Sequence, residues 1–319
     1  MRNRKVAILD LGTNTFHILI ARINGKSFHT LYREKIPVKI GDKGISDGKI
    51  SKEAWSRAMD SLYYIRELID RENIKDIYSI ATSAIRNAKN GNSFLSDVKD
   101  RIGLHINTID GDTEADYIYH GVKLGVNLGE KPALIMDIGG GSVEFIIGNN
   151  SEIFWKQSFE IGAQRLFDRY HIHDPLQERD ISKLYKYLDI ELKPLSVAIK
   201  ELGPDTLVGS SGTFDTLSTI HFIRKKMNRM VGVSEKHIDI EAFHPIHDEI
   251  VSKNRTERLQ IPGMVPMRAD MIAVASCLVN YVIKKYSIKK LIASSFALKE
   301  GLLVKLLDSN KNYSYLPKP

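Results

Sequence analysis

Short apolar runs alternate along this chain with longer segments in which apolar residues recur every three to four positions. The short runs suit buried strands, and the periodic segments suit helices with one apolar face. Each half opens with successive strands before helices and strands alternate, which predicts an α/β fold with parallel strands linked by helices. Strands are expected at residues 5–10, 16–23, 27–38, 77–81, 106–110, 133–137, 142–148, 153–159, 206–209 and 290–293. Helices are expected at residues 51–71, 92–102, 113–124, 163–170, 177–200, 213–224, 268–286 and 297–307.

The first strand of each half ends in an aspartate, Asp10 or Asp137. Each aspartate is followed by a turn of glycine and small polar residues: Gly12, Thr13, Asn14 and Thr15 after the first, and Gly139, Gly140, Gly141 and Ser142 after the second. Glycines let backbone N–H groups approach phosphate oxygens, and the hydroxyls add donors. One such turn is often an ordinary exit from a strand. Two in matching contexts predict phosphate binding in a cleft between two domains.

The aspartates also predict a metal ion. A carboxylate repels a polyanion, so both aspartates suit the site only if a hard cation such as Mg²⁺, or Mn²⁺ in its place, lies between them and the phosphate. Glu144 follows Ser142 by two residues on a strand and should face the same side. We therefore expect Asp10, Asp137 and Glu144 to bind the metal or its water shell, although Glu144 also suits a half-exposed strand.

Composition adds limits to this interpretation. The chain has 319 residues, 43% hydrophobic and 27% charged, which suits two domains and argues against global disorder. A net charge of +7 favours an anionic ligand. Nucleic acid is not the expected ligand, because the basic residues are scattered and are not interleaved with aromatic residues. No signal-peptide region or apolar run of membrane-spanning length is evident, and the one cysteine, Cys277, lies in an apolar stretch. We expect a cytoplasmic protein without an internal disulfide or membrane partner.

Five segments, read in order, resemble the exopolyphosphatase/guanosine pentaphosphate phosphatase (Ppx/GppA) family. They are DLGTNTFH at 10–17, ATSAIRNAKN at 81–90, GDTEADYIYHGV at 111–122, DIGGGSVE at 137–144 and VGSSGT at 208–213. The family belongs to the actin, sugar kinase and Hsp70 superfamily, so the resemblance implies two ribonuclease-H-like domains around a central cleft. The expected domains are residues 1–124, with a C-terminal helix at 298–319 packing back on them, and residues 125–297. The chain resembles the short, two-domain form of the family.

Glu114 is the catalytic candidate. Phosphoryl transfer to water needs a carboxylate that orients or deprotonates the water. Glu114 opens a helix directly after a strand, so it has a rigid mount near the cleft. From the residues alone, a first-turn glutamate that stabilises its helix dipole is the simpler interpretation. The resemblance implies the catalytic role, although Asp116 stands where the family usually has an arginine.

The phosphate-binding candidates lie on several segments. They are Thr13, Asn14, Thr15, Ser83, Arg86, Gly139, Gly140, Gly141, Ser142, Gly212, Thr213, Arg22 and Arg268. Arg86 offers a bidentate guanidinium, or is a plain surface arginine. Gly212 and Thr213 resemble a nucleotide-contacting turn but also suit a helix cap. Arg22 and Arg268 are candidates for the distal end of a long anion.

These features together predict a Mg²⁺-dependent phosphohydrolase that releases terminal phosphate from inorganic polyphosphate, guanosine pentaphosphate or both. The partners expected are polyphosphate or guanosine penta- or tetraphosphate, with a role in the stringent response, and a second copy of the chain in a homodimer. An ATP-dependent kinase of the same superfamily, or an alarmone or nucleotide sensor, are the alternatives. Phe296 and Lys299 depart from the family pattern near the C-terminus.

Overall fold

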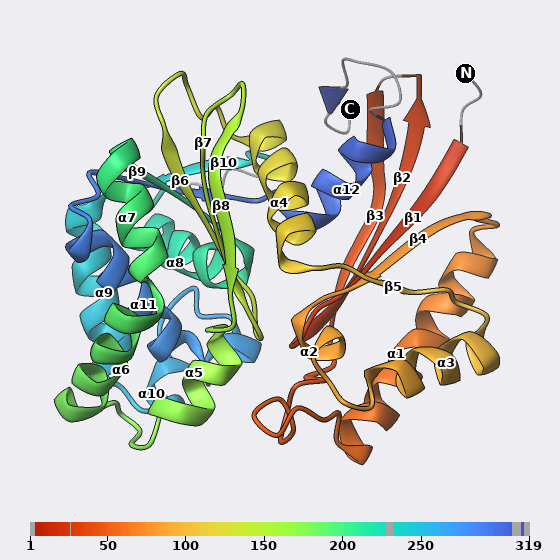
Figure 1. Cartoon of the computed structure of the whole chain (residues 1–319), viewed down its shortest axis with the longest axis horizontal. Helices are drawn as coiled ribbons and strands as arrows, with labels where there is room; N and C mark the ends of the chain where they lie inside the picture. Colours follow the sequence, from red (N-terminus) through yellow and green to blue (C-terminus); the bar gives the residue numbers. More distant parts are fainter. Residues whose placement is uncertain (1–3, 26, 228–231, 308–313, 316–319) are drawn as a thin grey trace.

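The computed structural model describes residues 4–25, 27–227, 232–307 and 314–315, which form two α/β units (Figure 1). The first unit is built on a six-stranded sheet of order β12-β3-β2-β1-β4-β5. Its strands are β1 (Arg4–Leu11), β2 (Thr15–Asn24), β3 (Ser27–Pro37), β4 (Asp76–Ala81), β5 (Asn107–Thr108) and β12 (Ser314–Tyr315). Strands β1, β2 and β3 form an antiparallel meander, and β4 pairs parallel to β1.

The second unit repeats this start. Its sheet has the order β10-β11-β9-β6-β7-β8. The strands are β6 (Ala133–Ile138), β7 (Val143–Gly148), β8 (Ile153–Phe159), β9 (Thr206–Ser210), β10 (Glu235–Ile238) and β11 (Lys290–Ser294). Strands β6, β7 and β8 form the antiparallel meander, and β9 pairs parallel to β6. The repeated strand pattern predicted from the sequence is confirmed, and it places Asp10 and Asp137 near the ends of equivalent strands.

Strand alternation distributes the core over both faces of the first sheet. Ala7 and Leu9 of β1 join the core formed with α1 (Lys52–Arg71) and α3 (Gly91–Ile102). Val6 and Ile8 point to the opposite face, into a second core. Ser51 caps α1, as predicted, because its side chain accepts a hydrogen bond from the Ala54 amide.

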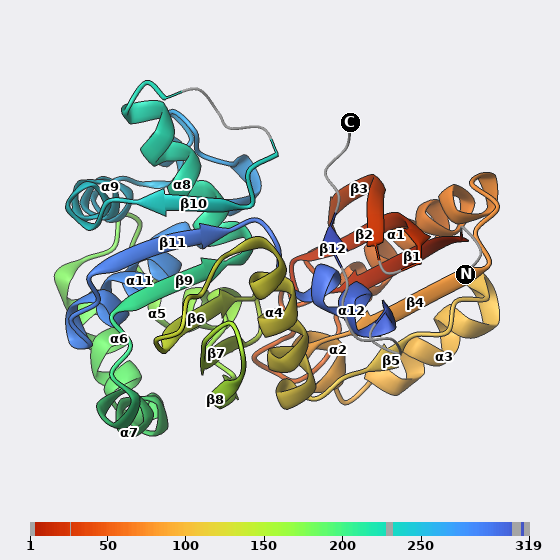
Figure 2. The ribbon, with the colours of Figure 1, turned by 90° about the horizontal axis from the view of Figure 1, so that it is seen from above.

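Two helices lie between the sheets, α4 (Gly111–Gly125) and α12 (Leu298–Leu307) (Figures 1 and 2). They cross so closely that a Cβ at Gly121 would lie 1.9 Å from the Ala297 carbonyl oxygen, and one at Gly301 1.6 Å from that of Tyr117. Glycine is therefore required at the crossing. Helix α4 also packs on β7 and β8, while α12 packs on β1. The two helices thus join the units through a shared core.

The remaining helices cover the second sheet, apart from the short α2 beside β4. They are α2 (Ser83–Arg86), α5 (Ala163–Tyr170), α6 (Glu178–Glu191), α7 (Lys193–Leu202), α8 (Ser211–Arg224), α9 (Ile240–Ser252), α10 (Arg255–Arg258), the 3₁₀ turn η1 (Pro266–Arg268) and α11 (Ile272–Lys285). Cys277 is fully buried in α11, as the apolar stretch predicted. No helix in the described ranges is long and apolar enough to cross a membrane.

Three element predictions are corrected. The helix expected at 177–200 is two helices, because Pro194 begins a new one in α7. The helix expected from 268 starts at Ile272, after the 3₁₀ turn. The helix expected at 298–319 ends at Leu307, and Ser314–Tyr315 pairs with β3 as a strand; residues 308–313 and 316–319 lie outside the described residues. The domain division at residue 124 stays a prediction, since α4 contacts the second sheet.

Candidate active site

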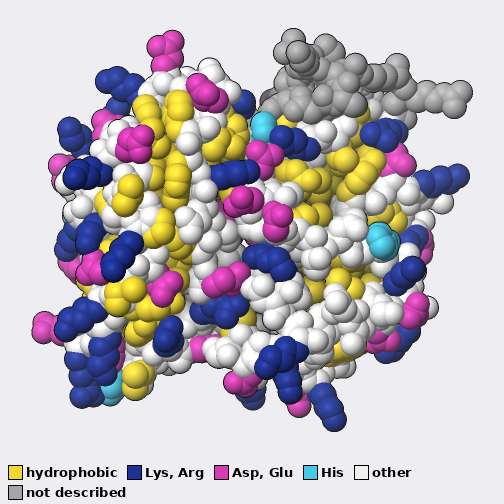
Figure 3. Space-filling model, viewed as in Figure 1, with side chains coloured by type: hydrophobic (Ala, Val, Ile, Leu, Met, Phe, Trp, Pro, Cys, Tyr) yellow, Lys and Arg dark blue, Asp and Glu magenta, His cyan; other side chains and the backbone are white. Residues whose placement is uncertain are grey.

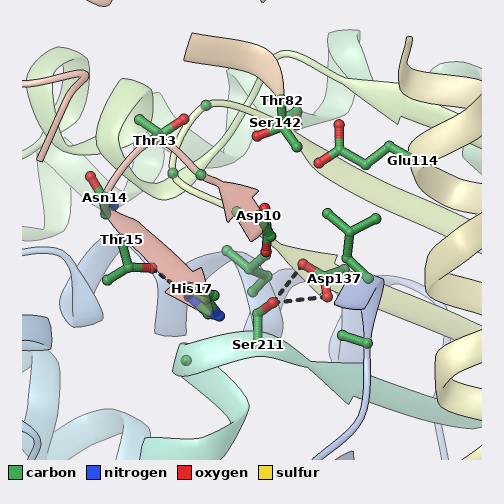
Figure 4. Close-up of a pocket in the computed structure, with 18 of the residues that line it drawn as sticks. Asp10, Thr13, Asn14, Thr15, His17, Thr82, Glu114, Asp137, Ser142 and Ser211 are labelled. Carbon is green, nitrogen blue, oxygen red and sulfur yellow. Dashed lines mark hydrogen bonds between the residues drawn. The ribbon is translucent and has the colours of Figure 1, made fainter. Parts of the chain in front are cut away.

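A cavity of about 80 Å³ lies between the two units, where β1 and β6 end (Figure 4). The loops that follow these strands form much of its wall. The lining includes Asp10, Gly12, Thr13, Asn14, Thr15, Glu114, Asp137, Gly139, Gly140, Gly141, Ser142, Gly212 and Arg268. The fold thus gathers segments that are far apart in the sequence into one site.

The two loops touch each other across the cleft. A Cβ at Gly140 would lie 2.7 Å from the Asn14 Nδ2 atom, and one at Gly141 would lie 2.5 Å from the Ser83 Oγ atom. Real Cβ atoms do not come this close to other atoms, so these positions need glycine. The glycines of the second loop therefore permit the units to close, in addition to exposing backbone N–H groups.

Two serine hydroxyls hold the Asp137 carboxylate. Ser210 Oγ donates to Oδ2 over 2.5 Å. Ser211 Oγ donates to Oδ1 over 2.8 Å (Figure 4). Ser210 reaches it because β9 pairs with β6 in a register that places Ser210 beside Asp137. Burial raises the pKa of Asp137 despite these bonds. This Gly-Ser-Ser-Gly turn is recognisable in the sequence, but the role of its serines was not predicted from it.

Asp10 lies opposite, at the end of β1. Its carboxyl is buried, and burial raises its pKa to about 6, with the Lys299 charge opposing the rise and Asp137 adding to it. Lys299 lines the cavity from α12. The departure from the family pattern at this position therefore lies in the site itself.

Glu114 points into the cavity from the first turn of α4, toward Ser142 and Thr82 (Figure 4). It is 6% exposed, and Arg86 Nη1 donates to its Oε2 atom over 3.0 Å. Burial and the nearby Glu144 charge raise the pKa of Glu114 well above its ordinary value, with Arg86 opposing them. The N-terminus of α4 is capped instead by Asp110, which accepts from the Thr113 amide over 2.7 Å. A glutamate that only stabilises the helix dipole would face solvent, whereas Glu114 is buried.

Glu144 is more deeply buried, at 1% exposure, and accepts from Ser158 Oγ over 2.7 Å. Burial and the Asp137 charge raise its pKa to about 8, so the group is largely protonated at neutral pH without a bound cation. Within the described ranges, no three His, Cys, Asp or Glu side chains are arranged to hold a metal ion. The assignment of a metal ion to Asp10, Asp137 and Glu144 therefore stays a prediction.

The two aspartates still suit a hard cation. Both line the same cavity, and oxygen ligands are those that Mg²⁺ and Mn²⁺ accept. Burial raises the pKa of both carboxyls, and a cation between them would favour their ionised forms. The donor set thus fits a divalent metal held by Asp10 and Asp137, while Glu144 lies beside Glu114 and is held by Ser158.

The predicted phosphate donors Ser83 and Arg86 already have partners. Ser83 Oγ donates to Glu160 Oε2 over 2.7 Å, and Arg86 pairs with both Glu114 and Glu160. Sequence analysis missed Glu160. Asn87 was not named either, although it follows Arg86 in the segment 81–90, and Arg165 was missed because no strand-and-turn motif marks it.

The remaining candidates divide by position. Arg268 lines the cavity and packs on Gly212. A Cβ on Gly212 would lie 2.2 Å from the Arg268 Cζ atom. Burial lowers the pKa of Arg268. Thr213 is buried in α8 and does not line the cavity. Arg22 is exposed near the far end of β2, away from the Thr15 end that meets the cavity, so its contact with a long anion stays a prediction.

His17 is a further lining residue that sequence analysis did not assign. It lies two residues after Thr15 on β2, and Thr15 Oγ1 and His17 Nε2 are 2.7 Å apart. Burial, then the charges of Lys299 and Lys35, lower its pKa well below the ordinary value. The imidazole is therefore neutral at physiological pH. The alternation of β2 was the signal that places it on the same face as Thr15.

Two α/β units with matching meanders, paired aspartates and glycine-rich loops around a shared cleft agree with the actin-like fold class predicted from the sequence. The chain belongs to the Ppx/GppA phosphatase family, whose sequence model matches residues 19–310. An exopolyphosphatase from Cytophaga hutchinsonii has a solved structure that is 41% identical, with a TM-score of 0.93 over 98% of this chain and all of that one. The Aquifex aeolicus family member is 25% identical, with a TM-score of 0.79 over 98% of this chain and all of that chain.

A curated relative from Photobacterium profundum is a guanosine-5'-triphosphate,3'-diphosphate pyrophosphatase. It is 28% identical over 307 residues, which are 96% of this chain and 60% of the relative. The chain therefore spans about 60% of the length of that protein. The two structural matches cover their partners fully and agree with the predicted two-domain fold.

Proposed function

We propose that this chain is a phosphohydrolase that releases the terminal phosphate from inorganic polyphosphate, guanosine pentaphosphate or both. The observation that carries the proposal is the Glu114 carboxyl, buried in the cavity between two phosphate-type loops. The names of the similar proteins from Cytophaga hutchinsonii and Photobacterium profundum support both substrates.

The chemistry assigns Glu114 the proton transfer. Water attacks the terminal phosphorus, the bond from phosphorus to the bridging oxygen breaks, and Glu114 accepts the proton from water. A raised pKa makes the carboxylate a better base near neutral pH. Arg86 holds the Oε2 atom and so fixes the orientation of the group. Thr13, Ser142 and the glycines of both loops line the cavity, and in this proposal their hydroxyls and backbone N–H groups hold the phosphoryl oxygens.

Mg²⁺, or Mn²⁺ in its place, completes the proposal as the cofactor held by Asp10 and Asp137. When bound there it would neutralise phosphate charge. We also propose a cytoplasmic location, which the free thiol of Cys277 suits, a homodimer, and a role in the stringent response.

Glu114→Gln tests the proposal. The amide keeps the size of the side chain but cannot accept the proton, so kcat should fall by about 10² to 10⁴. Asp112→Asn is the matched control, since Asp112 is an exposed acid in the same first turn of α4. Phosphate release should be measured on polyphosphate, guanosine pentaphosphate and ATP in parallel.

A folded Glu114→Gln variant with turnover within a few-fold of wild type would remove the assigned role. Loss of activity in Asp112→Asn as well would point to a helix-dipole effect instead. If only ATP is consumed, and only with a sugar or acid acceptor, the kinase alternative holds. Binding of guanosine pentaphosphate without turnover in the wild type would favour a sensor.

A further inference from the structure

The Glu160 carboxylate crosses the cleft and binds four donors. It lies in the loop between β8 and α5. Oε2 accepts from Ser83 Oγ over 2.7 Å and from Arg165 Nη2 over 3.0 Å. Oε1 accepts from Asn87 Nδ2 over 2.8 Å and from Arg86 Nη2 over 3.3 Å. We call this set of contacts the Glu160 bridge.

The bridge is an ionised carboxylate in a site suited to a stronger anion. Burial raises the pKa of Glu160, but the hydrogen bonds from Ser83 and Asn87 and the charges of both arginines outweigh it and hold the pKa below the ordinary value. Two guanidinium groups, a hydroxyl and an amide are the donors that proteins use for phosphate. The Glu160 side chain is 45% exposed, so an incoming solute can reach it.

The bridge lies between two cavities. The inner cavity of about 80 Å³ is lined by Gly141, and a Cβ on that glycine would lie 2.5 Å from Ser83 Oγ. The outer cavity, of about 390 Å³, is lined by Glu160 and Arg165 at the edge of the cleft. The inner cavity is far smaller than the roughly 300–1,000 Å³ of typical ligand sites. A chain of phosphates therefore has to extend beyond it. The bridge lies on one side where it can leave, and a cavity of about 300 Å³ that shares His17 and Lys299 with the inner one lies on another.

The backbone that carries Glu160 is tied to the second loop. The Gly162 amide donates to the Gly141 carbonyl over 3.1 Å, and Arg165 Nε donates to the same oxygen over 2.9 Å. A Cβ on Gly162 would lie 2.4 Å from the Gly140 carbonyl carbon, so this segment packs tightly on the loop. The Glu160 side chain, and not its backbone, is thus the part that can leave the bridge without disturbing the loop.

Charged side chains of both signs line the junction of the two units (Figure 3). Other contacts also cross it, such as Lys35 with Asp215 and Ser46 with Asp168. These contacts hold the units together without touching the four donors of the bridge. They therefore offer controls that separate closure of the cleft from competition for the donors.

We propose that Glu160 competes with substrate for a phosphoryl subsite built by both units from Ser83, Arg86, Asn87 and Arg165. The inference rests on the proposed function only for the identity of the substrate. When a polyphosphate chain enters, a phosphoryl group that follows the terminal one replaces the Glu160 carboxylate on these donors. An internal phosphoryl group carries one negative charge, as a carboxylate does, but the charges of its neighbours in the chain add to the attraction of the two arginines, so the bridge admits polyphosphates and disfavours anions with a single charge.

Equilibrium binding of tripolyphosphate tests this, measured by calorimetry with wild type, Glu160→Gln and Glu160→Asp. The amide of Gln offers one oxygen to two donors and turns its NH₂ toward the others. The Asp side chain keeps the charge but is one methylene group shorter, so its carboxylate cannot reach all four donors. Both should bind tripolyphosphate about tenfold more tightly, since a competing state that is about 90% populated raises the apparent Kd about tenfold. Asp168→Asn removes a charge from the same edge and should stay within about twofold.

A second arm tests the subsite itself. Asn87→Ala in the Glu160→Gln background should weaken tripolyphosphate binding several-fold. In that background the Asn87 side chain donates to phosphate, and the alanine removes this hydrogen bond. Equal or weaker binding in both Glu160 variants, or equal tightening in Asp168→Asn, would overturn the competition. No effect of Asn87→Ala would remove Asn87 from the subsite.

The outcome is separable from that of the proposed function. Binding of tripolyphosphate requires no turnover, so the Glu160 result stands even if wild type releases no phosphate from either substrate. Conversely, full hydrolysis by wild type together with unchanged tripolyphosphate binding in the Glu160 variants would support the phosphohydrolase activity and reject competition by Glu160.

Discussion

Asp137 shows how one side chain depends on its neighbours. The Ser211 hydroxyl lies 2.8 Å and 2.9 Å from its two oxygens, and Ser211 adopts a left-handed φ of 70°, a conformation rare for serine. Strain of this kind persists where the surrounding structure and function require it. The conformation is consistent with a hydroxyl that is held in place to orient the aspartate.

Ser211→Ala should therefore weaken metal activation. Loss of a side chain that positions a metal ligand typically reduces metal affinity about 10- to 100-fold, so the Mg²⁺ concentration for half-maximal phosphate release should rise by at least about tenfold. Ser218→Ala is the control, because its hydroxyl is buried in the same helix but donates to the Asp215 carbonyl. Equal Mg²⁺ titrations for wild type and Ser211→Ala would contradict the assignment.

Individual site residues were predictable where a strand fixes them. Asp10 and Asp137 end apolar strands, so their position at the cleft followed from the pattern. Ser210 meets Asp137 only through the pairing of two strands that are 73 residues apart in the chain. Glu160 reaches its donors across two units. Contacts of this kind depend on tertiary geometry, which no local pattern encodes.

At the scale of elements, the crossing of α4 and α12 connects the fold to the chemistry. Glu114 opens α4, and Lys299 lies in the first turn of α12. Both helices therefore deliver a cavity residue and meet at Gly121 and Gly301. Their spacing fixes where these two side chains lie.

Gly301→Ala should damage both stability and catalysis. The added methyl would lie 1.6 Å from the Tyr117 carbonyl oxygen, so the helices must separate. Overpacking of this kind costs about 1–3 kcal/mol of unfolding free energy, and kcat should fall because Glu114 moves with α4. Lys305→Ala on the same helix removes only a partly exposed ion pair with Asp116 and should cost at most about 1 kcal/mol. Chemical denaturation measures the unfolding free energy, and turnover assays measure kcat. Losses in Gly301→Ala no larger than those in Lys305→Ala would contradict the prediction.

Elements with strong periodicity were predicted well, and those interrupted by proline were not. The long helix that begins after Ser51 was found because its cap and apolar face agree. The prediction of one helix at 177–200 was wrong, because Pro194 lies in the first turn of a second helix and not in the interior of a single one. The short strand β10 and helix α9, which contains Pro245, were missed, since tertiary packing stabilises them more than their local pattern indicates.

For the whole molecule, two α/β units and a shared cleft followed from the repeated strand pattern. How tightly the units close did not, because closure depends on pairs such as Lys39 with Asp270, whose partners are distant in the chain. Four carboxyl groups are buried in this region: Asp10, Glu114 and Asp137 line the cavity, and Glu144 lies behind it. Their mutual repulsion should make the stability of the whole protein sensitive to pH and to cations.

The sign of this dependence follows from the raised pKa values. Burial raises the pKa of Asp10 to about 6 and, with the Asp137 charge, that of Glu144 to about 8, above the values of 3.8 and 4.5 in an unfolded chain. The folded protein thus binds more protons than the unfolded chain between about pH 4 and pH 8, and its unfolding free energy falls as pH rises through that window. For Asp10 alone the loss is about 3 kcal/mol.

In EDTA, the thermal midpoint should therefore fall between pH 5 and pH 8. Mg²⁺ should restore much of the loss at pH 8 and little at pH 5, since a cation stabilises only the ionised carboxylates. Asp10→Asn with Asp137→Asn should reduce both the pH dependence and the response to Mg²⁺, whereas Asp112→Asn, at an exposed position, should retain both. A thermal midpoint that rises with pH in EDTA would contradict the raised pKa values. A Mg²⁺ response that survives in the double variant would show that these aspartates are not the cation site.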